Sequence, residues 1–204
     1  VLFRSAASGA AVAIDRALAS RIGPGALSSL EFGTRLSGSF EGLLGVVIAN
    51  VGAVGLAQVV IRHSRTRYSL NANRLALIVI AAVSLPVLLL MWWTPQLVEL
   101  LYGGGRFTAD AADIVVKVQH GALARVPFYL AALYSGKALN AIHRSWAITR
   151  IMVVFALVSV AGDLILIPRL GVAGIAWATA FSYTVAAFLF MWSLRGNRQL
   201  ERRT

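Results

Sequence analysis

The feature that most constrains this chain is a long, mostly apolar run from Glu31 to Ile61, with an arginine close to its start. It reads EFGTRLSGSFEGLLGVVIANVGAVGLAQVVI. As a helix, these 31 residues would be about 46 Å long. The hydrocarbon layer of a membrane is only ~30 Å thick. The run therefore predicts a helix that crosses a membrane completely.

One face of this helix is nearly free of side chains beyond its arginine. From Arg35, steps of three and four residues reach Gly38, Gly42, Gly45, Ala49 and Gly52. Such a face either permits close approach of another helix or borders an open space. A packing stripe explains the glycines but not Arg35, because an arginine that faces lipid is costly and turns toward a partner or an aqueous cavity.

Composition places the whole chain in the membrane class. With 58% hydrophobic residues, 13% charged residues and a mean hydropathy of +0.76, it is too apolar for an ordinary soluble domain. The net charge of +11 comes from basic residues that lie mainly in short segments between apolar runs. That distribution fits the positive-inside rule and argues against a nucleic-acid partner. Since the chain has no cysteine, disulfides and thiolate metal sites are excluded.

The predicted fold is all-α: a polytopic bundle of six transmembrane helices, the first of them shortened. We expect helices at about 6–22, 26–61, 72–94, 109–140, 145–167 and 171–194. Pro86 predicts a kink inside the third helix rather than a break. Residues 95–108 read as a connection, because three consecutive glycines do not hold a regular helix, and Thr108 is placed to cap the next one.

The two ends of the chain carry separate expectations. Residues 1–5, VLFRS, are what a common sequencing-adapter tail encodes, and apolar sequence follows at once. We therefore expect residues 6–194 to be the carboxy-terminal part of a longer protein. Residues 195–204 form a basic tail. Inner segments hold about three times as many basic residues as outer ones if the second helix ends inside, which predicts a cytoplasmic carboxy terminus.

Three passages resemble one family, the MviN/MurJ-type lipid II flippases of the multidrug/oligosaccharidyl-lipid/polysaccharide exporter superfamily. They are LEFGTRLSGSFEGLLGVVIAN, LVELLYGGGRFTADAADIV and IPRLGVAGIAWATAFSYTVAAFLF. The second is the most specific, since related exporters share the last pattern. The chain departs from the family pattern at two positions: Gly38 stands where the family often has an acid, and Phe40 replaces its usual proline.

The resemblance implies one lobe of a two-lobe flippase in the bacterial inner membrane. Its six helices would correspond to the seventh to twelfth of the family. Such a lobe would help move a lipid-linked (undecaprenyl-pyrophosphate) peptidoglycan precursor such as lipid II to the outer leaflet by alternating access, for cell wall biogenesis and cell shape. Its partners would be that anionic precursor, membrane lipids and an amino-terminal lobe. The alternatives are a flippase for another polysaccharide or oligosaccharide lipid precursor, or a structural membrane subunit that transports nothing.

Three basic residues inside predicted spans are candidates to bind an anionic headgroup. They are Arg35, Arg125 and Lys117. Arginine suits a pyrophosphate because its planar fork binds two oxygens at once and stays charged. The competing structural interpretations are a pair of Arg35 with Glu31, one turn earlier, and a pair of Lys117 with Asp113, four residues earlier.

Four further residues could couple transport or serve structure: Glu31, Glu41, Asp113 and His120. Glu41 lies about 120° around the helix from Arg35, so it is not expected to pair with it. His120 could titrate near neutral pH or simply form a hydrogen bond. Asp163 is expected at the membrane interface. We expect no enzyme activity, cofactor or metal site, because the histidines lack ligand spacing and no phosphate-binding loop is present.

Overall fold

The computed structural model describes residues 2–62, 65–102 and 108–195, with side chains for 12–48, 69–102 and 108–195. Within these residues the chain forms six helices and no strand. They are α1 (Leu2–Ile22), α2 (Ala26–Arg62), α3 (Arg65–Tyr102), α4 (Ala109–Ala141), α5 (Ser145–Leu170) and α6 (Val172–Arg195). The predicted all-α, six-helix class is confirmed.

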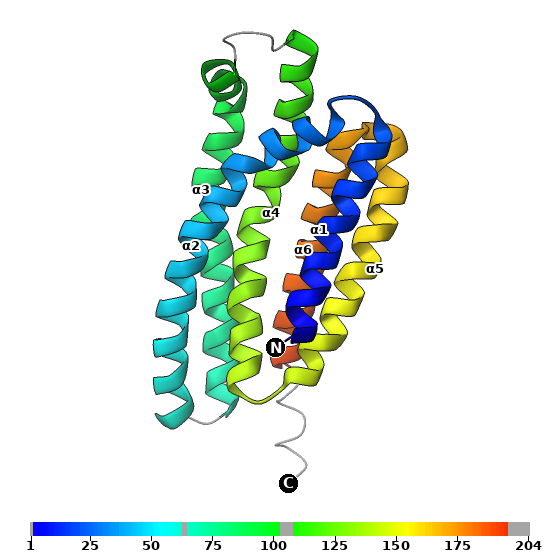
Figure 1. The fold of residues 1–204 in the computed structure, drawn as a ribbon. Coiled ribbons are helices and arrows are strands. Elements are labelled where there is room, and N and C mark those ends of the chain that lie inside the picture. The colour runs from blue at the N-terminus through cyan, green and yellow to red at the C-terminus, as the bar shows by residue number, and fades with distance from the viewer. Residues whose placement is uncertain (1, 63–64, 103–107, 196–204) are drawn as a thin grey trace.

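Helix α4 is the centre of the bundle. It packs along α6, α2 and α3, while α5 packs along the far side of α6. Figure 1 shows α2 and α3 on one side of α4, and α1, α5 and α6 on the other. Helix α1 makes only small contacts, with α5, α2 and α6. Consequently the space between α1, α2 and the rest of the bundle is not closed by tight helix packing.

The boundaries of α3 and α4 can be compared with those expected from the sequence. Thr108 caps α4 as expected, since its Oγ1 accepts a hydrogen bond from the Ala111 amide at 3.3 Å. Helix α3 differs from the expected 72–94: it begins at Arg65 and continues through Pro86 and Pro95 to Tyr102. Part of the segment that we expected to be a connection is therefore helical, because a proline removes one backbone donor without stopping an apolar helix in a membrane.

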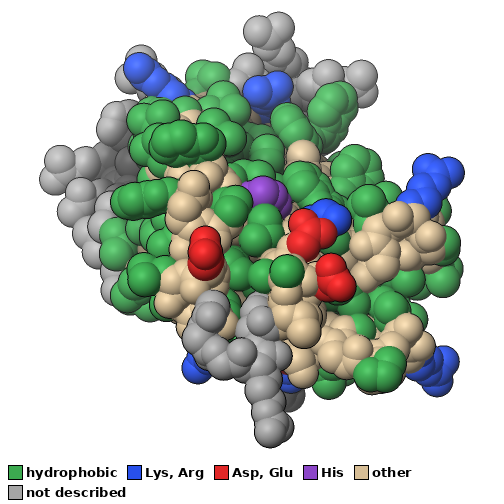
Figure 2. All heavy atoms as spheres, turned by 90° about the horizontal axis from the view of Figure 1, so that it is seen from above, with side chains coloured by type: hydrophobic (Ala, Val, Ile, Leu, Met, Phe, Trp, Pro, Cys, Tyr) green, Lys and Arg blue, Asp and Glu red, His purple; other side chains and the backbone are tan. Residues whose placement is uncertain are grey.

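The outside of the bundle is apolar, as a membrane protein requires. Large side chains such as Trp92, Leu100 and Trp192 are 78%, 81% and 75% exposed. Helices α5 and α6 and residues 69–102 of α3 are each long and apolar enough to cross a membrane, judged over the described part of the chain. Viewed along the bundle, hydrophobic side chains cover much of the visible face (Figure 2). These faces suit contact with lipid.

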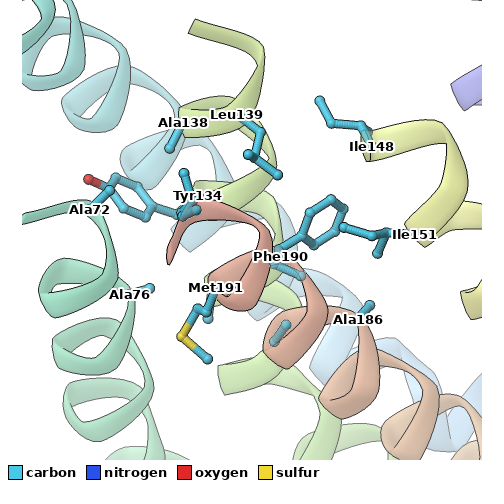
Figure 3. Close-up of a cluster of buried hydrophobic side chains, with 14 of the residues drawn as sticks. Ala72, Ala76, Tyr134, Ala138, Leu139, Ile148, Ile151, Ala186, Phe190 and Met191 are labelled. Carbon is cyan, nitrogen blue, oxygen red and sulfur yellow. The ribbon is translucent and has the colours of Figure 1, made fainter. Parts of the chain in front are cut away.

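The interior is built from small residues and a few large ones. Figure 3 shows one core cluster, in which Tyr134, Phe190 and Met191 pack among alanines of α3, α4 and α6. Close helix contacts depend on glycine: a Cβ on Gly121 would lie 2.9 Å from the Ala176 Cβ. Small residues at helix crossings are how membrane helices gain van der Waals contact where lipid removes the hydrophobic driving force.

Candidate functional site

A cavity of about 380 Å³ lies between α1, α2, α4, α5 and α6. Its lining is largely apolar and aromatic, but five polar side chains reach it: Asp15, Glu41, Arg125, Ser159 and Thr179. Each comes from a different helix. Ionisable groups inside a membrane bundle are costly and gather where a pathway or binding site needs them. This cavity is therefore the candidate site.

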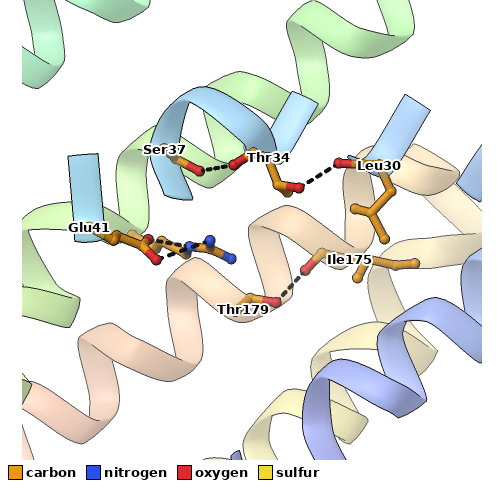
Figure 4. A network of polar contacts seen from close by, with 7 residues as sticks. Leu30, Thr34, Ser37, Glu41, Ile175 and Thr179 are labelled. Carbon is orange, nitrogen blue, oxygen red and sulfur yellow. Dashed lines mark hydrogen bonds and ion pairs between the residues drawn. The ribbon is translucent and has the colours of Figure 1, made fainter. Parts of the chain in front are cut away.

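Glu41 and Arg125 form an ion pair across the interface of α2 and α4. The Arg125 Nε donates to Glu41 Oε1 at 2.6 Å, and a second guanidinium nitrogen donates to Oε2 at 3.3 Å. Their side chains are only 17% and 15% exposed. Figure 4 shows the two dashed contacts at the Glu41 carboxylate. These two hydrogen bonds allow the Glu41 carboxylate to compensate the Arg125 charge, and they link α2 to α4.

A second polar cluster, beside the cavity, holds two acids that form none of the ion pairs of the described side chains, although Arg125 interacts electrostatically with Asp15. Asp163 of α5 is 1% exposed, and both of its carboxylate oxygens are buried without a hydrogen bond from any residue the structure describes. The Ser159 hydroxyl, one turn earlier, is also buried and has no hydrogen-bond partner among the described residues. Asp15 of α1 interacts electrostatically with Asp163. We define these two acids as the Asp15–Asp163 pair. We expected Asp163 at the membrane interface, and in the structure its carboxyl group faces the inside of the bundle.

Thr179 completes the oxygen-rich surroundings of the Asp15–Asp163 pair. Its hydroxyl donates to the Ile175 carbonyl one turn earlier, at 2.8 Å (Figure 4). The same hydroxyl also interacts with the Asp15 carboxyl group. Two neighbouring carboxyl groups in such surroundings call for a positive charge: a shared proton, a hard cation or the ammonium group of a ligand. Groups of three or more His, Asp or Glu residues that could hold a metal are absent from the described residues.

Three aromatic side chains in contact with one another form part of the cavity lining. Tyr129 and Tyr183 make an edge-to-face contact with ring centroids 5.3 Å apart, and Phe155 packs on Tyr183 at 4.7 Å. All three line the cavity. The faces of such rings carry negative potential, so they attract cations as well as apolar groups.

The two faces of α2 have different surroundings. Ser37 is buried, and a Cβ on Gly33 would meet Val118 of α4 at 2.6 Å. Arg35 is exposed, and a Cβ on Gly38 would meet nothing within 4 Å. The same holds at Gly42, so this part of the glycine face borders open space rather than a packed helix. Arg35 is not among the residues that line the cavity and takes part in none of the ion pairs of the described side chains.

The other sequence candidates form local pairs away from the cavity. Lys117 contacts Asp113 at 2.6 Å, and both side chains are about 60% exposed (62% and 60%). This is the pair that the spacing of four residues predicted. Glu31 pairs with Arg16 of α1 at 2.8 Å, and not with Arg35 as the structural interpretation had it. Pairs this exposed contribute little to stability.

His120 of α4 forms a hydrogen bond with the backbone of α3, one turn before Pro95. Its Nε2 lies 2.9 Å from the Met91 carbonyl oxygen, so the ring N–H donates to it. In a regular helix that carbonyl would accept from the amide of residue 95, which is Pro95 and has none. Beside it, Gln119 Nε2 donates to Thr94 Oγ1 at 3.3 Å. His120 thus satisfies a carbonyl that the proline leaves without a donor.

Our sequence reasoning did not select Asp15, Ser159, Thr179 or Tyr183, which line the cavity. A signal was present for Asp163, the single acid in the apolar run 146–167, and for Asp15 in AVAID. An acid in such a run is a functional candidate by itself. Ser159, Thr179 and Tyr183 carry no comparable signal, because hydroxyl residues are common in membrane helices.

A multi-pass bundle that keeps ionised side chains around an internal cavity has the features of a membrane transport protein. The comparisons name the family. The family described as "Lipid II flippase MurJ" matches residues 1–202. The chain therefore belongs to the MurJ lipid II flippase family, whose members are transporters and not enzymes.

A solved structure has the same fold. It is described as "Lipid II flippase MurJ, inward closed conformation", with a TM-score of 0.77 and 18% sequence identity. The match covers 93% of this chain and 40% of that chain, so this chain spans less than half the length of its solved relative. No curated protein matches the sequence significantly.

Proposed function

We propose that this chain is one lobe of a flippase that moves a lipid-linked peptidoglycan precursor such as lipid II from the cytoplasmic to the outer leaflet. It would work by alternating access together with an amino-terminal lobe, in the bacterial inner membrane and with its carboxy terminus in the cytoplasm. Membership of the MurJ family supports the cargo class. The 40% coverage of the solved relative supports the need for a second lobe.

The observation that carries the proposal is the open, arginine-bearing face of α2. Arg35 is exposed, Gly38 and Gly42 leave space beside it, and this arginine is outside the ion pairs of the described residues. A pyrophosphate needs a charged fork with room around it. Arg35 therefore binds the headgroup in this proposal. Arg125 and Lys117 stay secondary candidates, because Glu41 and Asp113 already compensate their charges.

The test is flipping of a fluorescent undecaprenyl-pyrophosphate lipid in liposomes that contain the chain together with its amino-terminal lobe. We expect Arg35→Ala to abolish flipping while protein abundance and melting temperature stay near those of the wild type. Arg35→Lys should restore only part of the rate, because an ammonium keeps the charge but not the bidentate geometry. Arg169→Ala, an exposed arginine at the end of α5, is the control.

Two results would contradict the proposal. One is an Arg35→Ala protein that is less stable but transports normally for each folded molecule, since Arg35 would then be structural. The other is rapid flipping by this chain alone as a monomer, because alternating access needs two bundles around one site. Orientation is tested separately: single cysteines at positions 64 and 104 should be labelled from opposite sides of the membrane.

A further inference from the structure

Helix α3 has a weak point where Pro95 interrupts its backbone hydrogen bonds. Pro95 has no amide hydrogen, so the Met91 carbonyl loses its partner within the helix. In the same turn, the Thr94 hydroxyl donates to the Leu90 carbonyl at 2.8 Å, a kind of contact that bends helices. Prolines inside helices are common sites of kinks. Residues 95–102, which we call the arm, are therefore joined to the rest of α3 by a weakened turn.

Helix α4 holds this weak turn with two neighbouring residues. Gln119 Nε2 donates to Thr94 Oγ1 at 3.3 Å, and His120 Nε2 donates to the Met91 carbonyl at 2.9 Å. Gln119 and Thr94 are 3% and 0% exposed, so their contact is shielded from water and lipid. We call these two hydrogen bonds the latch. The latch fixes α3 at the point where its own hydrogen bonding is weakest.

The arm beyond the latch has little packing of its own. Within the arm, which the structure describes in full, Val98 is the one buried residue, whereas Leu100 and Leu101 are 81% and 61% exposed. Segments with few buried apolar contacts open locally at a low cost in free energy. The end of the arm meets α2, where the rings of Tyr102 and Phe32 lie with their centroids 5.0 Å apart.

Phe32 lies beside the arginine that the proposed function uses. It precedes Arg35 by three residues, a spacing that places two side chains next to each other on the surface of a helix. Helices α2 and α3 make only small direct contacts. The contact of Tyr102 with Phe32 is therefore a route by which a movement of the arm can reach the turn that carries Arg35.

We propose that the arm pivots at Pro95, that the latch holds it in the position seen in the structure, and that Tyr102 transmits this position to the Arg35 turn of α2. A small shift of α4 along α3 opens the latch, because hydrogen bonds are lost beyond ~3.5 Å. The arm is then free to turn, and α2 follows it. The role of Arg35 rests on the proposed function, whereas the hinge itself does not.

The experiment measures distances between pairs of nitroxide labels by double electron–electron resonance, with the whole chain in lipid nanodiscs. The chain has no cysteine, so labels attached to introduced cysteines have no background. A label at Leu100 reports the arm, and a label at the exposed Ser39 reports α2. Each is paired with a label at Ile165, which is exposed on α5. A label at Leu89, on α3 before the hinge, paired with the same α5 position is the control.

Three sets of variants separate the hinge, the latch and the ring contact. Gln119→Leu with His120→Leu removes the latch and should widen the arm and α2 distance distributions about twofold, with the control distribution unchanged. Adding Pro95→Ala restores the missing amide and should return both to near the original width, whereas Pro86→Ala, at the other proline of α3, should not. Adding Tyr102→Leu instead should leave the arm distribution wide but return that of α2 to its original width.

Four results would overturn the inference. An arm distribution that keeps its width without the latch would show that Pro95 is no hinge. Equal effects of Pro95→Ala and Pro86→Ala would mean that α3 bends along its whole length. An α2 distribution that stays wide in the Tyr102→Leu variant would show that the ring contact transmits nothing. If the latch variant folds poorly, Pro95→Ala alone should narrow the arm distribution of the wild type, and an unchanged width would contradict the hinge. None of these measurements depends on flipping, so the proposed function can stand or fail independently.

Discussion

The Glu41–Arg125 pair and the Asp15–Asp163 pair flank the same cavity but differ in whether their charges compensate each other. The first joins an acid to a base with two hydrogen bonds, at 2.6 and 3.3 Å, and has few exposed atoms. The second brings together two acids, one of them fully buried and without a hydrogen bond inside the described residues. In the first pair each charge is compensated by its partner, whereas the second forms no ion pair among the described side chains and has only the electrostatic interaction of Arg125 with Asp15.

From this difference we infer that the Glu41–Arg125 pair has a structural role and that the Asp15–Asp163 pair has a functional one. A compensated pair between α2 and α4 holds two helices in register, and its removal leaves a charge stranded in the bundle. An uncompensated acid pair lowers stability, and it is retained where binding of a cation or proton is the purpose. The contrast therefore predicts opposite signs for mutations on the two sides of the cavity.

The largest effect is expected for Arg125→Ala. It leaves the Glu41 carboxylate buried without a partner, which should reduce the free energy of unfolding by about 3–5 kcal/mol. Thermal unfolding in detergent micelles measures the loss. Arg150→Ala is the control, because that arginine is exposed and lies 5.3 Å above the Trp146 ring. Its removal should cost less than about 1 kcal/mol.

A double variant sharpens the same comparison. Glu41→Leu combined with Arg125→Leu removes both charges, so most of the stability lost in Arg125→Ala should return. If the double variant were as unstable as the single one, packing of the arginine stem would matter more than the stranded charge.

Asp163→Asn should act in the opposite direction and more weakly. It removes one of two neighbouring acids, so we expect the free energy of unfolding to rise by about 1 kcal/mol in the absence of added ligand. Asp113→Asn, at an exposed acid paired with Lys117, is the matched control and should change stability by less than about 0.5 kcal/mol. A marked destabilisation by Asp163→Asn would mean that the carboxylate already has a compensating partner.

Much of the fold could be predicted from the sequence, because a helix that spans a membrane requires a long apolar run that is visible in the sequence. Apolar runs long enough to span lipid predicted six helices, and the described residues form six. Helix α3 is longer than expected, because residues 95–108 were interpreted as a connection on account of their three consecutive glycines. In the structure the helix continues, and the carbonyl that Pro95 leaves unpaired accepts a hydrogen bond from His120 on the next helix.

The site was harder to predict, for a related reason. The pair of Lys117 with Asp113 follows from local spacing, and the sequence predicted it. Glu41 and Arg125 are 84 positions apart, so their contact depends on the packing of α2 on α4. The same holds for Asp15 and Asp163 on α1 and α5. Spacing within one helix places a residue on a face, but it does not say which helix that face meets.

The last comparison tests the uncharged contact of His120 with α3. Replacing His120 by Leu removes the donor to the Met91 carbonyl and should cost about 1 kcal/mol of unfolding free energy. In a Pro95→Ala background the new amide of residue 95 can donate to that carbonyl along the helix, so His120→Leu should cost much less. The coupling energy between the two positions should therefore be about 1 kcal/mol, from denaturant unfolding of all four proteins in one detergent. An equal cost of His120→Leu in both backgrounds would show that the histidine stabilises the bundle by packing, and that the carbonyl left by Pro95 has no part in it.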